Sequence, residues 1–257
     1  MYTTGVILDI EDLSIKIKVL KVKLKSKIKP RPGQFVIMWA PDIGKVPLTI
    51  SDYYNRSLDL IIVASERTTH WLHRNLRRGV TVTIEGPYGR GFHTPRNKKC
   101  LIVTSDDGIA PFPFLIRRLL NLNSRTDVIL SFRRSKDVFV LSKLRHYAEN
   151  VYTCIEEYRR SRATYNLPEE LLKKGIYEMV YVGGRGDLIL SLVHLCNYLK
   201  LPCEISLDGV VRCYITTCRY CTFKSLGVVF CKEGFIVGPE LIAKMVRCNI
   251  IKPDWYY

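Results

Sequence analysis

Apolar and polar residues alternate with a period of two over much of the first third of the chain. The alternation is clearest in residues 14–24, and short apolar runs follow at 35–39, 58–64 and 80–84. This periodicity predicts β-strands, and turn-forming residues separate the runs. We therefore expect a small antiparallel β-barrel, interrupted by one helix at about 69–76.

Beyond a basic linker at 96–99, strand patterns alternate with helix patterns. This alternation predicts a parallel sheet covered by helices on both faces, that is, an α/β domain. The last part of the chain is a cysteine-rich appendage in this interpretation. We thus predict three parts, at 1–96, 97–200 and 201–257. The strands of the second part are expected at 100–103, 128–132, 151–155 and 179–182, and its helices at 111–120 and 188–199.

The overall composition is that of an ordinary globular protein. The 257 residues are 47% apolar and 25% charged, which suffices for a sizeable core. Residues 1–11 carry neither a basic segment nor a long apolar stretch, so no secretory signal is predicted. The other apolar runs are too short to cross a bilayer. We expect a soluble, cytoplasmic protein.

Four of the nine cysteines gather near the carboxyl end, at Cys213, Cys218, Cys221 and Cys231. Their spacing, C-x4-C-x2-C and then a distant fourth cysteine, matches the plant-type arrangement that holds a 2Fe-2S cluster. Zinc is a competing interpretation, but its usual signature is two short cysteine pairs, and only Cys218 and Cys221 form one. Uncommitted thiols are the third interpretation.

The other five cysteines are scattered along the chain. Without an export signal, we expect reduced thiols instead of a disulfide framework. Small apolar residues of the core are the simplest interpretation for Cys100, Cys154, Cys196, Cys203 and Cys248.

The formal net charge of +16 indicates an acidic partner, which could be nucleic acid, an anionic cofactor or a negatively charged protein. The basic residues are spread along the chain, without the aromatic pattern of an RNA-binding sheet or a zinc-finger spacing. A nucleic-acid role is therefore not favoured. A heat-adapted surface is an alternative that needs no partner.

Two stretches around the cysteines resemble a known family. Residues 206–213, Ser-Leu-Asp-Gly-Val-Val-Arg-Cys, are similar to the lead into the cluster loop of the electron-transfer subunits of class 1B dihydroorotate dehydrogenase, relatives of the ferredoxin reductases. Residues 231–234, Cys-Lys-Glu-Gly, resemble the Cys-Lys-Asp-Gly element that supplies the fourth ligand there. The resemblance covers nearly the whole chain. It implies an FAD-binding barrel, a Rossmann-like nicotinamide-binding domain and a small 2Fe-2S segment, in the order predicted above.

The resemblance also implies a set of flavin-binding residues in the barrel. Residues 47–49 are similar to the family's Arg-Pro-x-Ser/Thr motif, with Val46 in place of the arginine and Lys45 beside it. Residues 61–63 would run along the flavin. The alternative for Pro47 is a proline-broken edge strand. The implied flavin-binding residues are Pro47, Leu48, Thr49, Ile61, Ile62, Val63, Thr68, Thr69 and Gly86.

The last three of these residues belong to two further motifs. Thr68 and Thr69 match a Gly-Thr pair that opens a helix near the FAD pyrophosphate, with Thr68 in place of the glycine. A helix amino terminus favours a diphosphate through its free N–H groups, although an ordinary N-cap is the simpler interpretation. Gly86 begins a stretch at 86–92 that resembles the family's Gly-Pro-x-Gly-x-Gly-Phe turn.

The nicotinamide site departs from the family pattern. Relatives carry a run of glycines before Gly108, where this chain has Thr104-Ser105-Asp106-Asp107. Carboxylates at a helix start satisfy its N–H groups and repel a pyrophosphate. The family's later Cys-Gly-Pro element is Gly183-Gly184-Arg185 here. The sequence therefore leaves open whether NAD(H) binds.

We predict an oxidoreductase electron-transfer subunit that passes electrons between FAD and the 2Fe-2S cluster, with no catalytic side chain of its own. The resemblance implies an FMN-bearing catalytic dihydroorotate dehydrogenase subunit as partner, in pyrimidine biosynthesis. Alternatives are a subunit that exchanges electrons with an acidic carrier such as ferredoxin and does not use NAD(P)H, a zinc-stabilised basic binding module, and an assembly factor without the catalytic partner.

Overall fold

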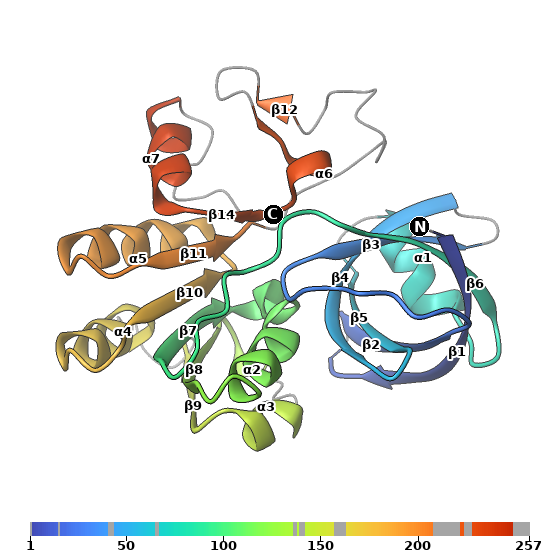
Figure 1. Cartoon of the computed structure of the whole chain (residues 1–257), viewed down its shortest axis with the longest axis horizontal. Coiled ribbons are helices and arrows are strands. Elements are labelled where there is room, and N and C mark those ends of the chain that lie inside the picture. Colours follow the sequence, from blue (N-terminus) through green and yellow to red (C-terminus); the bar gives the residue numbers. More distant parts are fainter. Residues whose placement is uncertain are drawn as a thin grey trace.

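A closed barrel and an α/β sheet lie side by side in the computed structural model of the chain (Figure 1). Both bodies agree with the predicted change of pattern after the first hundred residues. No described helix combines the length and the apolar character that a bilayer crossing requires. The structure describes residues 2–14, 16–40, 44–64, 67–135, 138, 142–156, 163–207, 222–223 and 228–248.

The barrel is antiparallel throughout, with the strand order β1-β2-β5-β4-β3-β6. Alternate side chains of all its strands fill the interior, as period-two patterning requires. Helix α1 (Arg67–Asn75) adds Leu72 to this core, and Leu76 just beyond the helix does the same. The strands are β1 (Tyr2–Asp12), β2 (Ile17–Leu24), β3 (Phe35–Ala40), β4 (Gly44–Tyr54), β5 (Ser57–Val63) and β6 (Thr81–Tyr88).

Strand β4 bears on one alternative from the sequence. It runs unbroken through Pro47, so the strand is not broken there. Pro47 itself pairs with Ile37 of β3, whereas the pairs of β4 with β5 run from Ile50 to Tyr54. Proline has no N–H to donate, and a position paired along one side tolerates this loss.

The second sheet has the order β14-β11-β10-β7-β8-β9 among the described strands, and only β14 is antiparallel to its neighbour. Apolar clusters lie on both of its faces, which confirms the predicted doubly covered sheet. The strands are β7 (Lys99–Ser105), β8 (Arg125–Phe132), β9 (Asn150–Ile155), β10 (Met179–Gly183), β11 (Cys203–Ser206) and β14 (Ile236–Val237).

Helices cover the two faces of this sheet in two groups (Figure 1). One face carries α2 and α3, and the other carries α4, α5 and α7. The bounds are η1 (Asp106–Ile109), α2 (Phe112–Leu120), α3 (Ser142–Tyr147), α4 (Ala163–Lys173), α5 (Gly186–Tyr198) and α7 (Pro239–Arg247). Beyond the sheet lie β12 (Thr222–Phe223), β13 (Val228–Val229) and α6 (Phe230–Glu233).

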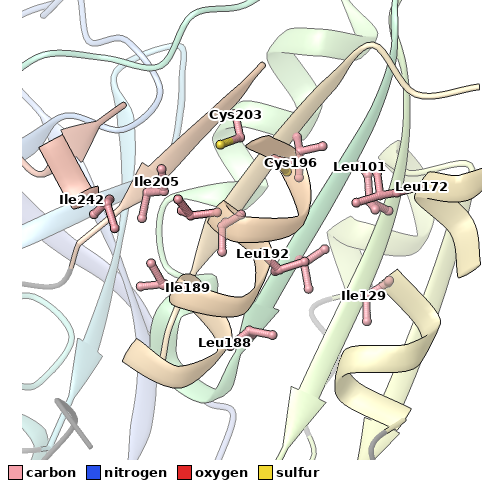
Figure 2. Packing of buried hydrophobic residues seen from close by; sticks show 14 of the residues in the cluster. Leu101, Ile129, Leu172, Leu188, Ile189, Leu192, Cys196, Cys203, Ile205 and Ile242 are labelled. Atoms are coloured by element: carbon pink, nitrogen blue, oxygen red, sulfur yellow. The ribbon is translucent and has the colours of Figure 1, made fainter. Parts of the chain in front are cut away.

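The core on the α5 face contains two of the scattered cysteines. Cys196 of α5 and Cys203 of β11 lie among leucine and isoleucine side chains (Figure 2). Cys100 and Cys154 are buried as well, but Cys248 is exposed. The interpretation of the scattered cysteines as core residues therefore holds for four of them and is wrong for Cys248, which directly follows helix α7.

The third predicted part does not stand apart from the sheet of the second. Strands β11 and β14 both lie in residues 201–257, and both pair within the second sheet. The pairing ties the segment that carries α6 to the α/β body. The division at 200 stays a prediction, and the described residues show how closely its two sides are joined.

Ion pairs and apolar packing fix the barrel against the sheet. Arg117 of α2 donates to Asp52 Oδ1 through both Nε and Nη2, at 2.9 and 2.6 Å, and also to the Tyr53 carbonyl at 2.6 Å. The Asp52 side chain is buried, so this pair is shielded from solvent screening. Phe114 of α2 reaches into the barrel's own core cluster. The two bodies therefore meet along α2 and β4.

Candidate functional site

One outer face of the barrel gathers most of the residues that the resemblance assigns to the flavin. Leu48 and Ile62 belong to the interior cluster, so their side chains point away from this face. Because side chains alternate along a strand, their neighbours point outward. The outer face of β4 and β5 therefore carries Pro47, Thr49, Ile61 and Val63.

Strand register sets these side chains in adjoining rows. Phe35 pairs with Thr49, and Ile61 pairs with Val19. The pairing of β4 with β5 runs from Tyr54 to Ile50, which lies opposite Leu60, so Thr49 and Ile61 are the next residues beyond its last pair. Pro47, Thr49 and Val63 are only partly buried, whereas Ile61 is covered within the cluster that includes α2. The result is a partly open apolar face with one hydroxyl group.

The face continues across β3 towards a surface pocket of about 240 Å³. Ile37, which lines the pocket, pairs with Pro47 of the outer face. Two exposed aromatic side chains, Tyr2 and Trp39, stand at its sides. The pocket is lined by Tyr2, Ile37, Trp39, Lys45, Thr83 and Glu85.

Lys45, which stands next to the position of the family's arginine, is held by the pocket wall. Its Nζ donates to Glu85 at 2.9 Å, and the Tyr88 hydroxyl donates to the same carboxylate at 2.5 Å. Burial alone would raise the pKa of Glu85, but hydrogen bonds from Lys45 and Tyr88 lower it below its usual value. Burial and the Glu85 charge raise the pKa of Tyr88, which keeps its hydroxyl protonated. Lys45 is thus committed to a carboxylate.

Helix α1 begins just beyond the strand that carries Ile61 and Val63. Thr69 lies in its first turn, is partly buried and has an interaction partner in the structure. The backbone of Thr68 lies in the same turn, and its side chain is outside the described residues. The predicted diphosphate-binding turn therefore starts at one end of the outer face.

Gly86 lies at the other side of the face, near the end of β6. It is buried and has a φ of +130°, a backbone conformation that residues other than glycine rarely adopt. A Cβ there would stand 3.2 Å from the Tyr88 ring and 3.4 Å from the Phe35 carbonyl oxygen. A glycine is therefore required by backbone conformation at this point, beside the Phe35–Thr49 row.

The turn after Gly86 meets the carboxyl-terminal segment. A Cβ on Gly89 would stand 2.8 Å from the Gly234 Cα, so the two backbones touch. Arg90 N donates to the Glu233 carbonyl at 2.7 Å. The rings of Phe35 and Phe235 are 5.4 Å apart. Helix α6 is therefore anchored against the barrel, next to the strand that borders Thr49.

The predicted cluster ligands fall largely outside the described residues. Cys213, Cys218 and Cys221 lie there entirely, and of Cys231 the backbone alone is described, within α6. Within the described part of the chain, no group of three or more His, Cys, Asp or Glu side chains could hold a metal ion. The four-cysteine site therefore stays a prediction, with the backbone of its fourth member placed beside the barrel.

A second candidate region is the carboxyl edge of the parallel sheet. The strand that follows β7 in sequence, β8, lies on one side of β7, and the later strand β10 lies on the other side. The strand order therefore reverses between β7 and β10. Ligands of such sheets bind in the crevice outside this switch point. In this chain, Arg185 follows β10 at that position and is buried, with its side chain 3% exposed.

Carboxylates surround the Arg185 guanidinium. Nη2 donates to Glu156 Oε1 at 2.6 Å, Nε donates to Asp187 Oδ1 at 3.2 Å, and Nη1 stands 3.7 Å from Asp106 Oδ2. Burial alone would lower the pKa of Arg185, but its hydrogen bonds to Glu156 and Asp187 raise it. Burial alone would raise the pKa of Asp187, whose hydrogen bonds from Tyr165 and Arg185 lower it. All of these results favour the charged forms of Arg185 and Asp187.

Part of this network was predictable from the sequence, and the rest was not. Asp106 and Arg185 were recognised as departures from the family pattern, whereas Glu156 and Asp187 were not. Glu156 directly follows strand β9, and a charged residue at the carboxyl end of a predicted parallel strand was the available signal. Its contact with Arg185 depends on the strand order, which the sequence pattern does not give.

Comparison with curated proteins finds that the chain is similar to electron-transfer subunits. No protein-family model matches it. The electron transfer subunit of dihydroorotate dehydrogenase B (NAD(+)) from Clostridium acetobutylicum is 29% identical over 244 residues, covering 90% of this chain and 94% of that protein. Probable subunits of the same name are 29% identical in Archaeoglobus fulgidus (91% and 96% covered) and 24% identical in Thermococcus kodakarensis (96% and 100%).

Solved structures with the same fold come from flavin-dependent reductases. An NADH-dependent reduced ferredoxin-NADP oxidoreductase, studied for flavin-based electron bifurcation, has a TM-score of 0.78 and 17% identity, covering 92% of this chain and 88% of its own. The ferredoxin reductase of carbazole 1,9a-dioxygenase has a TM-score of 0.67 and 15% identity, covering 79% and 67%. At such identities the likeness concerns the fold.

These comparisons confirm two predictions from the sequence. The chain resembles dihydroorotate dehydrogenase B electron transfer subunits over most of its length, and its fold is the ferredoxin-reductase-like pair of an antiparallel barrel and a parallel-sheet domain. They also agree with the prediction of an oxidoreductase electron-transfer subunit.

Proposed function

We propose that the chain is the electron-transfer subunit of a flavin-dependent oxidoreductase, holding FAD on the outer face of the barrel and a 2Fe-2S cluster in its carboxyl-terminal segment. Its catalytic partner would be a dihydroorotate dehydrogenase subunit. The observation that carries the proposal is the contact between α6 and the barrel turn at 89–90, since it joins the segment of the fourth cysteine to the border of the flavin face.

The residues of the outer face suit a flavin. An isoalloxazine ring is flat and largely apolar, with polar atoms at its edge. Pro47 and Val63 offer partly exposed apolar surface, and the partly exposed Thr49 offers a hydroxyl group on the same face. Leu48 and Ile62 would contribute through their backbone, because their side chains lie in the barrel core. Bound FAD would exchange electrons in pairs, whereas the cluster would exchange them singly.

The barrel and the α6 segment would keep the two cofactors close. Phe35 pairs with Thr49 on one side, and its ring lies 5.4 Å from the Phe235 ring on the other. The side chains of Phe35 and Phe230 and the backbone at Gly234 are buried. Packing of this kind would exclude water from the space between the proposed cofactors.

In the family that the sequence resembles, the partner subunit carries FMN and oxidises dihydroorotate to orotate in pyrimidine biosynthesis. We extend that role to this chain on the likeness over nine tenths of its length. The assembly would be a hetero-oligomer in the cytoplasm. The chain itself would hold and tune cofactors, and the redox chemistry belongs to them.

An absorption spectrum with metal analysis tests the proposal. Protein produced with sufficient iron should show flavin bands and sulfide-dependent visible absorption, and should contain iron, sulfide and FAD. Cys218→Ser should remove the iron-dependent absorption and leave the flavin bands. Cys248→Ser is the matched control, because Cys248 is exposed and lies outside the four-cysteine motif. Colourless protein with bound zinc would instead support the zinc-stabilised module.

The basic surface favours one further candidate, a subunit that exchanges electrons with an acidic carrier protein. Lysines recur along β2 and in the loop that follows it. Arg31, at the end of this loop, packs against Gly91, so the basic residues approach the turn at 89–91. Charge steering would then make the reaction with a reduced ferredoxin slower as salt rises. The basic series comprises Lys18, Lys21, Lys23, Lys25, Lys27, Lys29 and Arg31.

A further inference from the structure

We infer that an internal ion network closes the dinucleotide crevice of the parallel sheet, so that NAD(H) does not bind the second body of this chain. The inference rests on the proposed function, because it concerns which partner exchanges electrons with the subunit. The relatives are named for NAD(+), and their fold uses the crevice at the switch point for such a cofactor. The residues at that place in this chain do not fit it.

The Arg185 side chain occupies the crevice itself. Arg185 follows β10, and its guanidinium reaches Glu156, which follows β9. Strands β7 and β8 lie between β10 and β9. The backbone N–H of Arg185 donates to Ser105 at the end of β7, and Glu156 contacts Ser131 near the end of β8, so the ion pair lies over the ends of these two strands. Glu156 is fixed in turn by Ser131 Oγ at 3.2 Å and by Thr164 Oγ1 at 3.1 Å. A pyrophosphate over the end of β7 would have to displace this buried ion pair.

Asp106 takes the place where a pyrophosphate would approach the backbone. Its φ is +49°, a conformation that glycine adopts without strain and that aspartate visits only at a cost. Its carboxylate accepts from Arg133 N at 3.4 Å beyond β8 and faces Arg185 Nη1 at 3.7 Å beyond β10. The carboxylate thus links the ends of the two strands that flank β7.

The loops on the two sides of the switch point are in direct contact. A Cβ on Gly108 would stand 2.3 Å from Gly184 N, and one on Gly184 would stand 2.3 Å from Ser105 Oγ. Ser105 Oγ accepts a hydrogen bond from Arg185 N at 2.9 Å. The glycines here let backbone approach backbone. In a dinucleotide-binding fold such glycines let a phosphate approach the backbone, whereas here the backbone of one loop approaches the other loop.

The charge of the network also opposes a dinucleotide. Among the described residues that pair with Arg185, Asp106, Glu156 and Asp187 are all carboxylates. Arg185 Nη1 has no hydrogen-bond partner in the described part of the chain, but the Asp106 carboxylate stands near it. A pyrophosphate would bring two further negative charges close to these carboxylates.

Calorimetry and flavin reduction under anaerobic conditions test the inference on the cofactor-loaded protein. NADH should give no saturable heat up to about 1 mM, the upper end of usual KM values, and should not reduce the flavin in stopped flow. Saturable NADH binding with bleaching of the flavin would overturn the inference and leave the proposed function intact. Light-driven reduction of the same sample is the control, because it shows that the bound flavin can be reduced.

A failure of the proposed function would give a different experimental result from a failure of this inference. Protein that contains neither flavin nor iron after full loading would refute the electron-transfer role, while the calorimetric titration with NADH would still decide whether the crevice is closed. The two results are therefore independent.

A crevice-opening variant tests the cause. Arg185→Ala with Glu156→Gln removes the spanning side chain and one negative charge, and should lower the NADH dissociation constant by at least about tenfold. The matched control, Lys98→Ala with Glu178→Gln, removes an exposed ion pair and should bind no better than the unchanged protein. If the first variant does not fold, Asp106→Gly takes its place, since glycine suits a φ of +49°. A folded variant without gain would overturn the inference.

Discussion

The outer face of the barrel and the carboxyl edge of the parallel sheet are the two candidate cofactor sites of this chain, and they differ in what covers them. The barrel face presents uncharged side chains that are partly open to solvent, namely Pro47, Thr49 and Val63. The sheet edge is filled by Arg185 and its carboxylates. One fold can thus keep one cofactor surface and fill the other, because each surface depends on a few residues at strand ends or on strand faces.

The largest expected effect concerns the buried arginine. Arg185→Leu leaves Glu156 and Asp187 without their cation, and loss of one partner from a buried ion pair costs about 3 to 5 kcal/mol. Urea unfolding of the two proteins measures this difference. Lys98→Leu breaks an exposed pair with Glu178 and should cost no more than about 1 kcal/mol. Equal losses would show that the network does not support the sheet edge.

The opposite, amino edge of the same sheet offers a pH-dependent comparison. Asp127 is buried and accepts from Tyr177 at 2.7 Å and pairs with Lys99 at 2.8 Å. Burial alone would raise its pKa, but these contacts and Asn150 lower it below the usual value near 4. Stability from Asp127 is therefore present above about pH 4 and is lost as the pH falls through the lowered pKa.

Asp127→Asn tests this dependence. It should cost about 1 to 3 kcal/mol at pH 7, since Tyr177 and Lys99 lose a charged acceptor. The difference in Tm between the unchanged protein and Asp127→Asn should narrow as the pH falls below about 4, the usual carboxyl pKa, and through the lowered pKa of the native carboxylate. A gap that is constant over this range would contradict a role for the Asp127 charge.

A lysine on the barrel face should separate flavin binding from folding. Thr49→Lys places a long charged side chain opposite Phe35 on the outer face, and should weaken FAD binding at least about tenfold, or about 1.4 kcal/mol. Flavin content after dialysis measures the effect. Thr81→Lys changes an exposed β6 residue and should leave flavin content unchanged. Full retention of flavin by Thr49→Lys would show that the flavin does not bind at this face.

The smallest perturbation is chemical labelling, which changes no residue. Burial raises the pKa of Cys100 to about 12, and the nearby Glu178 charge adds to the effect. Iodoacetamide at pH 8 should therefore modify the exposed Cys248 and spare Cys100 until the protein is unfolded, as read by peptide mass spectrometry. Rapid labelling of Cys100 in the native protein would contradict its placement in the core.

Much of the architecture was predictable because it depends on local periodicity. Period-two alternation predicts strands, and the change to alternating strand and helix patterns predicts the second body; both are found. Alternation also decides which residues share a face of a strand. It therefore implies that Thr49 and Leu48, as neighbours in β4, point to opposite faces. Strands β1 and β4 and helices α3, α4 and α7 were not predicted individually, since tertiary packing outweighs weak local patterns.

The sequence by itself determined the order of the parts, the spacing of the four cysteines and the departure of Asp106 and Arg185 from the dinucleotide pattern. Only the tertiary structure decided what that departure does. Glu156 meets Arg185 because β9 and β10 lie on opposite sides of β7 and β8, and a long arginine can extend across the intervening strand ends. Strand order is set by packing between distant segments, and no local pattern of residues encodes it.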